Sequence, residues 1–209
     1  MANLKKNFSD LLEFVNNKVC FVRCDFNLPI VDNKITDFTR LDAIIPTLEK
    51  LISRNARIIL ISHLGRPKGK VDENLSLEIM VPHLEERLKK SIFFCKEKIL
   101  SSETAEKIKK LPPKGVLLLE NIRFYKQEEE NDINFSRKIS EYGDIYINES
   151  FATSHRKHAS ITGISAFLPS FPGKLFEKEI KNLNVITQDL SQSHSVAILG
   201  GAKISTKVA

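Results

Sequence analysis

Cationic side chains in this sequence stand directly after short apolar runs, where β-strands are expected to end. The clearest example is the run 58–61, Ile-Ile-Leu-Ile, which opens into the loop Ser62-His63-Leu64-Gly65-Arg66-Pro67-Lys68-Gly69. Open α/β sheets place their ligands in loops that follow the strands. Guanidinium groups stay charged and bind phosphate or carboxylate oxygens in pairs. The chemistry that these residues indicate is the binding of an anion.

A second run, 19–22, ends in alternating polar and apolar residues. Arg23, Asp25 and Asn27 recur with period two, so they share one face of the expected strand. A parallel sheet that is covered on both sides should be apolar on both faces, so these polar groups suggest the lining of a crevice. The alternative is a strand that simply leaves the sheet at Pro29.

Two later runs end in the same way. Arg123 follows the run 116–119, and the run 144–148 is followed by a segment that contains His155, Arg156 and His158. A metal site at the two histidines is the less favoured alternative, because no carboxylate or cysteine stands at a matching spacing. A serine nucleophile is unsupported, since no Gly-x-Ser-x-Gly turn precedes a helix. We therefore expect anion ligands here and no metal ligands.

Arg40 falls in the first turn of a predicted helix, whose apolar stripe runs over 41–52 at helical spacing. Thr36 or Asp37 is the expected N-cap. The helix dipole disfavours a cation in the first turn by about 0.3 to 1 kcal/mol, unless an anion lies nearby. Arg40 is therefore a candidate anion ligand, and partial neutralisation by Asp37 or Asp42 is the alternative explanation.

Apolar runs of strand length alternate with helical patterns along most of the chain. Strands are expected at 19–23, 58–61, 92–95, 116–119 and 144–148, and helices near 41–52, 76–88, 101–110 and 135–142. This βαβ series predicts a mostly parallel sheet flanked by helices, a three-layer Rossmann-like α/β domain. The acidic run 128–132 is expected to be a solvated loop or the start of a helix.

The last part of the sequence indicates a connection to a second domain. A helical pattern runs from Gly173 to about Asp189, and a strand at 195–199 precedes Gly200, Gly201 and Lys203. Paired glycines before a helix start can form a phosphate cradle, although the Walker pattern is absent. We expect a ligand-binding domain at 1–173, a helix and linker at 174–193, and at 194–209 the first strand of a second, similar domain.

Composition restricts the class of protein. The 209 residues are 42% hydrophobic and carry a net charge of +6 with both signs interspersed, which is typical of a globular protein and unlike a basic nucleic-acid arm. Cys20, Cys24 and Cys95 lack metal spacing and are expected to be reduced, buried side chains in a cytoplasmic protein. No apolar run approaches the length of a membrane span.

Taken together, these motifs resemble the phosphoglycerate kinase family, and the resemblance extends over essentially the whole sequence. It is carried, in the family's order, by segments 23–29, 37–40, 62–69, 118–125, 148–158 and 197–207. The resemblance implies a two-domain enzyme whose N-terminal half binds 3-phosphoglycerate and whose C-terminal half binds a magnesium nucleotide. The implied reaction is reversible phosphoryl transfer from 1,3-bisphosphoglycerate to ADP.

The resemblance also assigns roles, one matching position at a time. Arg40 and Lys203 would be catalytic, with Arg40 nearest the transferring phosphoryl group. The implied substrate-binding set is Arg23, Asp25, Asn27, Arg40, His63, Leu64, Gly65, Arg66, Arg123, His155 and Arg156. The implied nucleotide-binding set is Gly200, Gly201, Lys203 and Lys207. ADP or ATP with Mg²⁺ would be the co-substrate, and the magnesium ligands are expected mostly beyond Ala209.

Segment 149–154 departs from the family pattern. Glu149, Ser150, Ala152 and Ser154 stand where Asp, Ala, Gly and Ala are usual. If position 152 requires a positive φ, an alanine there costs about 1 kcal/mol or more. We therefore expect an altered loop geometry, with His155 and Arg156 keeping their assignment.

The favoured hypothesis is an enzyme, and the alternative is a non-catalytic module that binds anions or nucleic acid. The net charge motivates the alternative, but the sequence shows no aromatic platform for bases. The 209-residue chain alone is expected to bind 3-phosphoglycerate without turnover. The full-length protein is expected to be a cytoplasmic monomer with small-molecule partners and neither nucleic-acid nor membrane partners.

Overall fold

The structure, a computed structural model, describes residues 7–188. The expected strand at 195–199 and the loop with Gly200, Gly201, Lys203 and Lys207 lie outside the described residues. The chain divides into two units, Met1–Glu177 and Lys178–Ala209, and the site described below belongs to the first.

The centre of the first unit is a six-stranded sheet in which every neighbouring pair of strands is parallel. Its strand order is β5-β6-β4-β1-β7-β8. The strands are β1 (Val19–Arg23), β4 (Arg57–Ile61), β5 (Phe93–Cys95), β6 (Val116–Leu119), β7 (Ile145–Asn148) and β8 (Ser170–Pro172). A separate antiparallel hairpin joins β2 (Ile30–Val31) to β3 (Lys34–Ile35). The predicted α/β class is confirmed.

Helices and single turns connect the strands. The helices are α1 (Phe8–Leu11), α2 (Thr39–Ser53), α3 (Val81–Leu88), α4 (Ser102–Lys109), α5 (Lys126–Glu129), α6 (Ile133–Ser140) and α7 (Lys174–Gln188). The turns are η1 (Glu73–Leu75), η2 (Leu77–Met80), η3 (Ile122–Phe124), η4 (Phe151–Thr153), η5 (Ala159–Gly163) and η6 (Ile164–Ala166), of which η5 is a π-helical turn.

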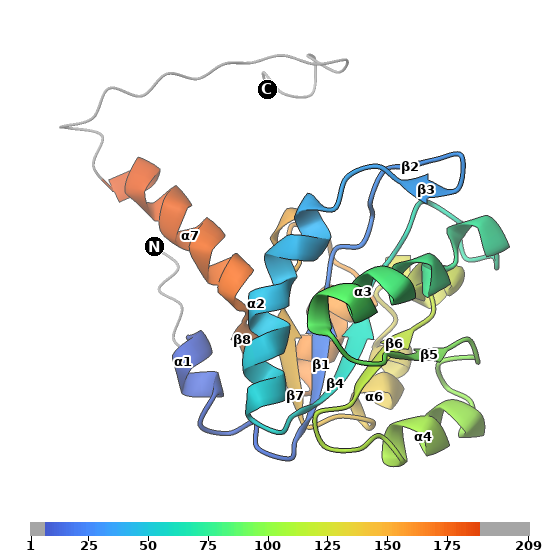
Figure 1. The fold of residues 1–209 in the computed structure, drawn as a ribbon, viewed down its shortest axis with the longest axis horizontal. Coiled ribbons are helices and arrows are strands. Elements are labelled where there is room, and N and C mark those ends of the chain that lie inside the picture. The colour runs from blue at the N-terminus through green and yellow to red at the C-terminus, as the bar shows by residue number, and fades with distance from the viewer. Residues whose placement is uncertain (1–6, 189–209) are drawn as a thin grey trace. The chain divides into compact units, whose positions relative to one another are not determined.

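The sheet is covered on both faces, and the central positions of its inner strands are apolar on both sides. Alternate residues such as Cys20 and Val22 belong to a core with α1, α2 and α3, while Val19 and Phe21 belong to a second core with α4 and α6. Figure 1 shows α2 and α3 together on the near face of the sheet. The result is the predicted three-layer arrangement.

The carboxyl ends of the central strands meet at one edge. In the sheet register, Arg23 at the end of β1 stands between Ile61 of β4 and Asn148 of β7. The backbone continues this alignment, because Cys24 N donates to Ile61 O and Glu149 N donates to Arg23 O. The loops that follow these three strands therefore start side by side.

The local expectations hold with small shifts. Helix α2 begins at Thr39 and has Phe38 at its N-cap, so the expectation of Thr36 or Asp37 is wrong. Asp37 Oδ1 instead accepts a hydrogen bond from Thr39 N at 2.7 Å and supports the first turn from outside it. Arg40 lies in that first turn, as predicted.

The cysteines are buried, as expected. Cys20, Cys24 and Cys95 are free and buried. No helix within 7–188 combines the length and the apolar character that crossing a bilayer requires.

Candidate anion-binding site

Arg23 and His63 form the buried centre of the site. Arg23, only 1% exposed, reaches His63 Nδ1 with its Nη2 at 3.1 Å and also donates from Nη1 to the carbonyl of Cys24. A guanidinium can only donate, so Nδ1 of His63 accepts and the ring proton of the neutral histidine belongs on Nε2. This contact therefore fixes both the orientation and the tautomer of His63.

The electrostatics of His63 reveal an excess of positive charge. Burial, and after it the charges of Arg23, Arg123, Arg156 and His158, together lower its pKa to about 2. Because these four charges all act in the same direction, the potential at this edge of the sheet is positive. An anion would relieve that potential.

Arg123 adds a buried cation from the loop after β6. It is 3% exposed, and its Nη1 donates to Gly65 O at 2.8 Å. Its Nε lies 3.5 Å from Glu129 Oε1 but has no hydrogen-bond partner among the described residues. Burial, followed by the charge of Arg156, lowers the pKa of Arg123. Because buried donors are normally paired, this orphaned N–H is a direct sign of an incomplete site.

Arg40 stands at the rim, where a carboxylate holds it. Its Nη1 lies 3.1 Å from Asp25 Oδ2 and 3.0 Å from Asn27 O. Asn27 in turn accepts from Gly65 N through its Oδ1 at 2.9 Å. Asp25 and Asn27, two of the three polar residues predicted to share a face after β1, thus connect Arg40 to the loop that follows β4.

That loop is shaped by Gly65 and Leu64. Gly65 has a φ of +62°, and a Cβ there would lie 2.7 Å from Leu75 Cδ2, so only glycine fits without displacement. The carbonyl of buried Leu64 accepts from Asn121 Nδ2 at 2.8 Å. These two residues contribute backbone geometry to the site.

The structure does not bring all the predicted ligands into contact. Arg66 and His155 are exposed, and neither side chain hydrogen-bonds to another residue in the described part of the chain. Arg156 is half-buried, and its charge acts on both His63 and Arg123. The site therefore has a buried core and outer basic residues, of which Arg66 and His155 have no side-chain hydrogen bond among the described residues.

Sequence reasoning missed a buried carboxylate, Glu128. It was expected in a solvated run, but it is 0% exposed and accepts from Ser160 N at 2.8 Å and from Ser160 Oγ at 2.6 Å. The expectation was wrong because helix α5 turns this one residue inward while its neighbour Glu129 stays half-exposed. Nothing in a run of acidic residues marks which one faces the core.

The departure at 149–154 causes no backbone strain at Ala152. Ala152 lies in the turn η4 and is not among the residues with positive φ in the described chain. The altered residue with a clear structural consequence is Glu149, which is buried and accepts from Thr47 Oγ1 and from Phe176 N in the first turn of α7. Burial raises its pKa to about 6, and these hydrogen bonds oppose the rise.

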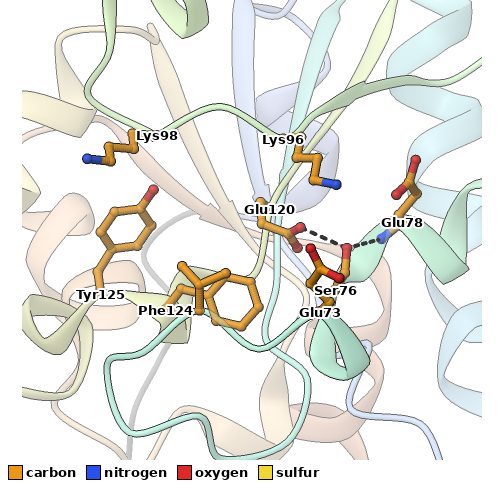
Figure 2. Close-up of a pocket in the computed structure, with 9 residues that line it drawn as sticks. Glu73, Ser76, Glu78, Lys96, Lys98, Glu120, Phe124 and Tyr125 are labelled. Carbon is orange, nitrogen blue, oxygen red and sulfur yellow. Dashed lines mark hydrogen bonds between the residues drawn. The ribbon is translucent and has the colours of Figure 1, made fainter.

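A second cavity opens at the ends of β5 and β6, with a volume of about 370 Å³. Figure 2 shows its lining, where Lys96 and Lys98 face three glutamates and the rings of Phe124 and Tyr125. Glu120 there is already satisfied by Ser76 Oγ at 2.7 Å and by two backbone N–H groups. None of the predicted ligands lines this cavity, and its mixed charges do not suit a small multivalent anion.

The described residues offer no fit for a resident metal. Within 7–188, no group of three or more His, Cys, Asp or Glu side chains is placed to hold one. His158, which was weighed as a metal ligand, lies 3.7 Å from Glu128 Oε1. The described residues therefore do not form a Mg²⁺ site.

Comparison with known proteins gives the family. The family model for phosphoglycerate kinase matches residues 9–209. The phosphoglycerate kinase of Finegoldia magna is 43% identical over 205 residues, which are 98% of this chain and 51% of that protein. The enzyme of Borrelia hermsii is 44% identical over 194 residues, 93% of this chain and 49% of that protein.

Solved structures agree. The phosphoglycerate kinase of Pyrococcus horikoshii superimposes with a TM-score of 0.83 at 33% identity, covering 93% of this chain and 49% of that one. The structure from Coxiella burnetii has a TM-score of 0.77 at 32% identity, covering 93% and 48%. The chain spans about half the length of the curated relatives it matches, and it belongs to the phosphoglycerate kinase family.

Proposed function

We propose that this chain supplies the 3-phosphoglycerate site of an enzyme that transfers a phosphoryl group reversibly between 1,3-bisphosphoglycerate and ADP. The observation that carries the proposal is the cation cluster at the ends of β1, β4 and β6, with an orphaned Arg123 Nε and a histidine that stays neutral beside it. The family to which the chain belongs supports the reaction class.

The composition of the cluster suits phosphoryl transfer. That reaction passes through a loose transition state that needs positioning and charge stabilisation more than a general base. The group that accepts the phosphoryl group from ATP is a carboxylate, which has no proton to remove. Arg23, Arg123 and Arg156 would bind the anionic groups of the substrate from the core outward. Arg40, half-exposed and held by Asp25, would reach toward the transferring phosphoryl group.

The remaining roles in this proposal follow from the resemblance. Lys203 would stabilise the phosphoryl group in transit, and Gly200, Gly201 and Lys207 would contact nucleotide phosphates. Mg²⁺ would enter with ADP or ATP and neutralise charge on the phosphates, held mostly by residues beyond Ala209. The unit 1–173 would bind the substrate, with 174–193 as the connection to a nucleotide domain that starts at 194.

The chain by itself would bind 3-phosphoglycerate without turning it over, because the nucleotide site would be incomplete. The proposal also holds that the full-length protein is a cytoplasmic monomer whose partners are small molecules. The alternative of a non-catalytic anion or nucleic-acid binding module is not favoured, since the relatives that match are named as kinases.

Calorimetric titration of the 209-residue chain with 3-phosphoglycerate tests the proposal. We expect one saturable site, weakened about ten-fold or more in Arg156→Ala and in Arg66→Ala because each removes a phosphate-binding cation. Arg54→Ala is the matched control, since Arg54 is exposed at the end of α2, near the opposite edge of the sheet.

Two results would overturn the proposal. One is the absence of saturable binding by a wild-type chain that unfolds cooperatively. The other is an equal loss of affinity in the Arg54→Ala control, which would indicate nonspecific attraction to a basic protein.

A further inference from the structure

Glu128 lies behind the site, not in it, and both of its carboxylate oxygens accept hydrogen bonds from Ser160, with His158 Nδ1 a further 3.7 Å from Oε1. Oε2 accepts from Ser160 N at 2.8 Å, and Oε1 accepts from Ser160 Oγ at 2.6 Å. Glu128 and Ser160 are both 0% exposed. A carboxylate buried this deeply is costly unless its partners are fixed, so the pair forms a rigid unit.

The hydrogen bonds of Ser160 run in one direction. Arg23 Nε can only donate, so at 2.8 Å the hydroxyl oxygen of Ser160 is its acceptor. The single hydroxyl proton is then left for Glu128 Oε1. A chain of two hydrogen bonds, here called the relay, therefore runs from the Arg23 guanidinium through the Ser160 hydroxyl to the Glu128 carboxylate. Arg23 can only donate in it, and the Glu128 carboxylate can only accept.

Ser160 is itself held from two further sides. Tyr146, buried in β7, donates from its hydroxyl to Ser160 O at 2.8 Å. Ser160 also belongs to the π-helical turn η5, in which His158 O accepts from Thr162 N at 2.9 Å and from Gly163 N at 3.3 Å. Turns of this kind are rare and occur frequently at functional sites. The hydroxyl that receives Arg23 thus has little freedom to move.

The relay determines which atoms of Arg23 remain for a ligand. Its Nε is used by Ser160, while Nη2 meets His63 and Nη1 donates to Cys24 O. Each terminal nitrogen carries a second N–H, and these two groups remain as donors for a ligand. Without the bond at Nε, only the terminal nitrogens would hold the guanidinium, and its plane could shift.

We propose that Glu128 is a positioning residue of the anion site, which acts on Arg23 through the Ser160 hydroxyl and does not touch the substrate. The part of this inference that concerns 3-phosphoglycerate rests on the proposed function. The relay itself concerns only the orientation of Arg23 and can be tested without any ligand. A carboxylate with a merely structural role would affect folding stability and leave the Arg23 guanidinium unchanged.

The first experiment observes the Arg23 Nε–H group by ¹⁵N–¹H NMR in the 209-residue chain. Ser160→Ala should shift that signal and speed its exchange with water about ten-fold or more, because the acceptor is gone. Glu128→Gln should do the same to a smaller extent, since the amide can still accept from Ser160. Ser165→Ala is the matched control, as the Ser165 hydroxyl donates to Thr162 O and does not contact Arg23.

The second experiment is a double-mutant cycle on the dissociation constant of 3-phosphoglycerate, with urea unfolding of every variant. Ser160→Ala should weaken binding about ten-fold in the wild-type background and have no effect in Arg23→Lys, because the hydroxyl acts only through the guanidinium. An equal loss in both backgrounds, or an Arg23 signal unchanged in both Ser160→Ala and Glu128→Gln, would overturn the inference.

The two proposals fail in different ways. If the folded wild-type chain binds no 3-phosphoglycerate, the proposed function fails, and the NMR experiment still decides whether the relay orients Arg23. If the chain binds 3-phosphoglycerate but the cycle shows no coupling, the proposed function stands and the positioning role of Glu128 is wrong.

Discussion

His63 and Glu149 follow β4 and β7, the two strands that flank β1 in the sheet, and burial favours the neutral form of both. Their surroundings differ. His63 is surrounded by cations that drive its pKa further down, to about 2. Glu149 is surrounded by N–H and O–H donors that favour its charged form and limit its pKa to about 6. Glu149 is thus part of a paired local structure, whereas the charges that act on His63 are all positive.

The largest effect should come from Arg123, whose Nε lies 3.5 Å from Glu129 Oε1 and has no hydrogen-bond partner within 7–188. Arg123→Met should weaken 3-phosphoglycerate binding about 100-fold, because a buried guanidinium that meets the ligand is removed. Its unfolding free energy should change by less than about 1 kcal/mol, since a desolvated cation is replaced by an apolar chain. Calorimetry and urea unfolding measure the two quantities, with Arg54→Met as the control. A large loss of stability with unchanged affinity would make Arg123 structural.

Glu149 should make the free energy of unfolding depend on pH. Native Glu149 has a pKa of about 6 and the unfolded chain titrates near 4.5, so the native state binds more protons between these values. This residue therefore favours folding below pH 4.5, and that contribution is lost as the pH rises through 6, by about 2 kcal/mol.

Glu149→Gln should remove this dependence. The difference in unfolding free energy between wild type and variant, measured at pH 4.5 and 7.5, reports it. Glu141→Gln, an exposed change in the loop after α6, is the control. A difference that stays constant across this range would mean that Glu149 titrates normally.

His63 should make the free energy of unfolding depend on pH in the opposite direction. His63 stays neutral in the native state, while the unfolded chain takes up a proton near pH 6.5, so stability is lost as the pH falls below 6.5. The loss is about 1.4 kcal/mol by pH 5.5. NMR of the His63 ring should show no titration between pH 8 and 5.5 without ligand. A native transition near pH 6.5 would contradict the positive potential inferred here.

The smallest effect concerns Ala152, where the family usually has glycine. Because its φ is not positive, Ala152→Gly should give no gain and should lower the unfolding free energy by about 0.4 to 1 kcal/mol through the freer unfolded chain. Urea unfolding measures this change. A stabilised glycine variant would show that the alanine is strained after all.

Much of the site was predictable because strand ends are encoded locally. The apolar runs of β1, β4, β6 and β7 are visible in the sequence, and parallel strands carry their following loops to one edge. That reasoning alone placed Arg23, His63 and Arg123 together. It could not separate them from Arg66 and His155, which follow the same strands but remain exposed.

The sequence by itself determined the α/β class and the positions of β1, β4, β5, β6 and β7, but not β2, β3 or β8, because apolar runs of strand length are local properties and the last three strands contain no such run. The anionic ligand stays a prediction from residue chemistry. Only the tertiary structure decided which charges are buried and which donors are paired. Glu128 is the clearest case, since its burial depends on Ser160, 32 positions away in the chain. Burial and hydrogen-bond partners arise from contacts between distant segments, and no spacing along the chain records them.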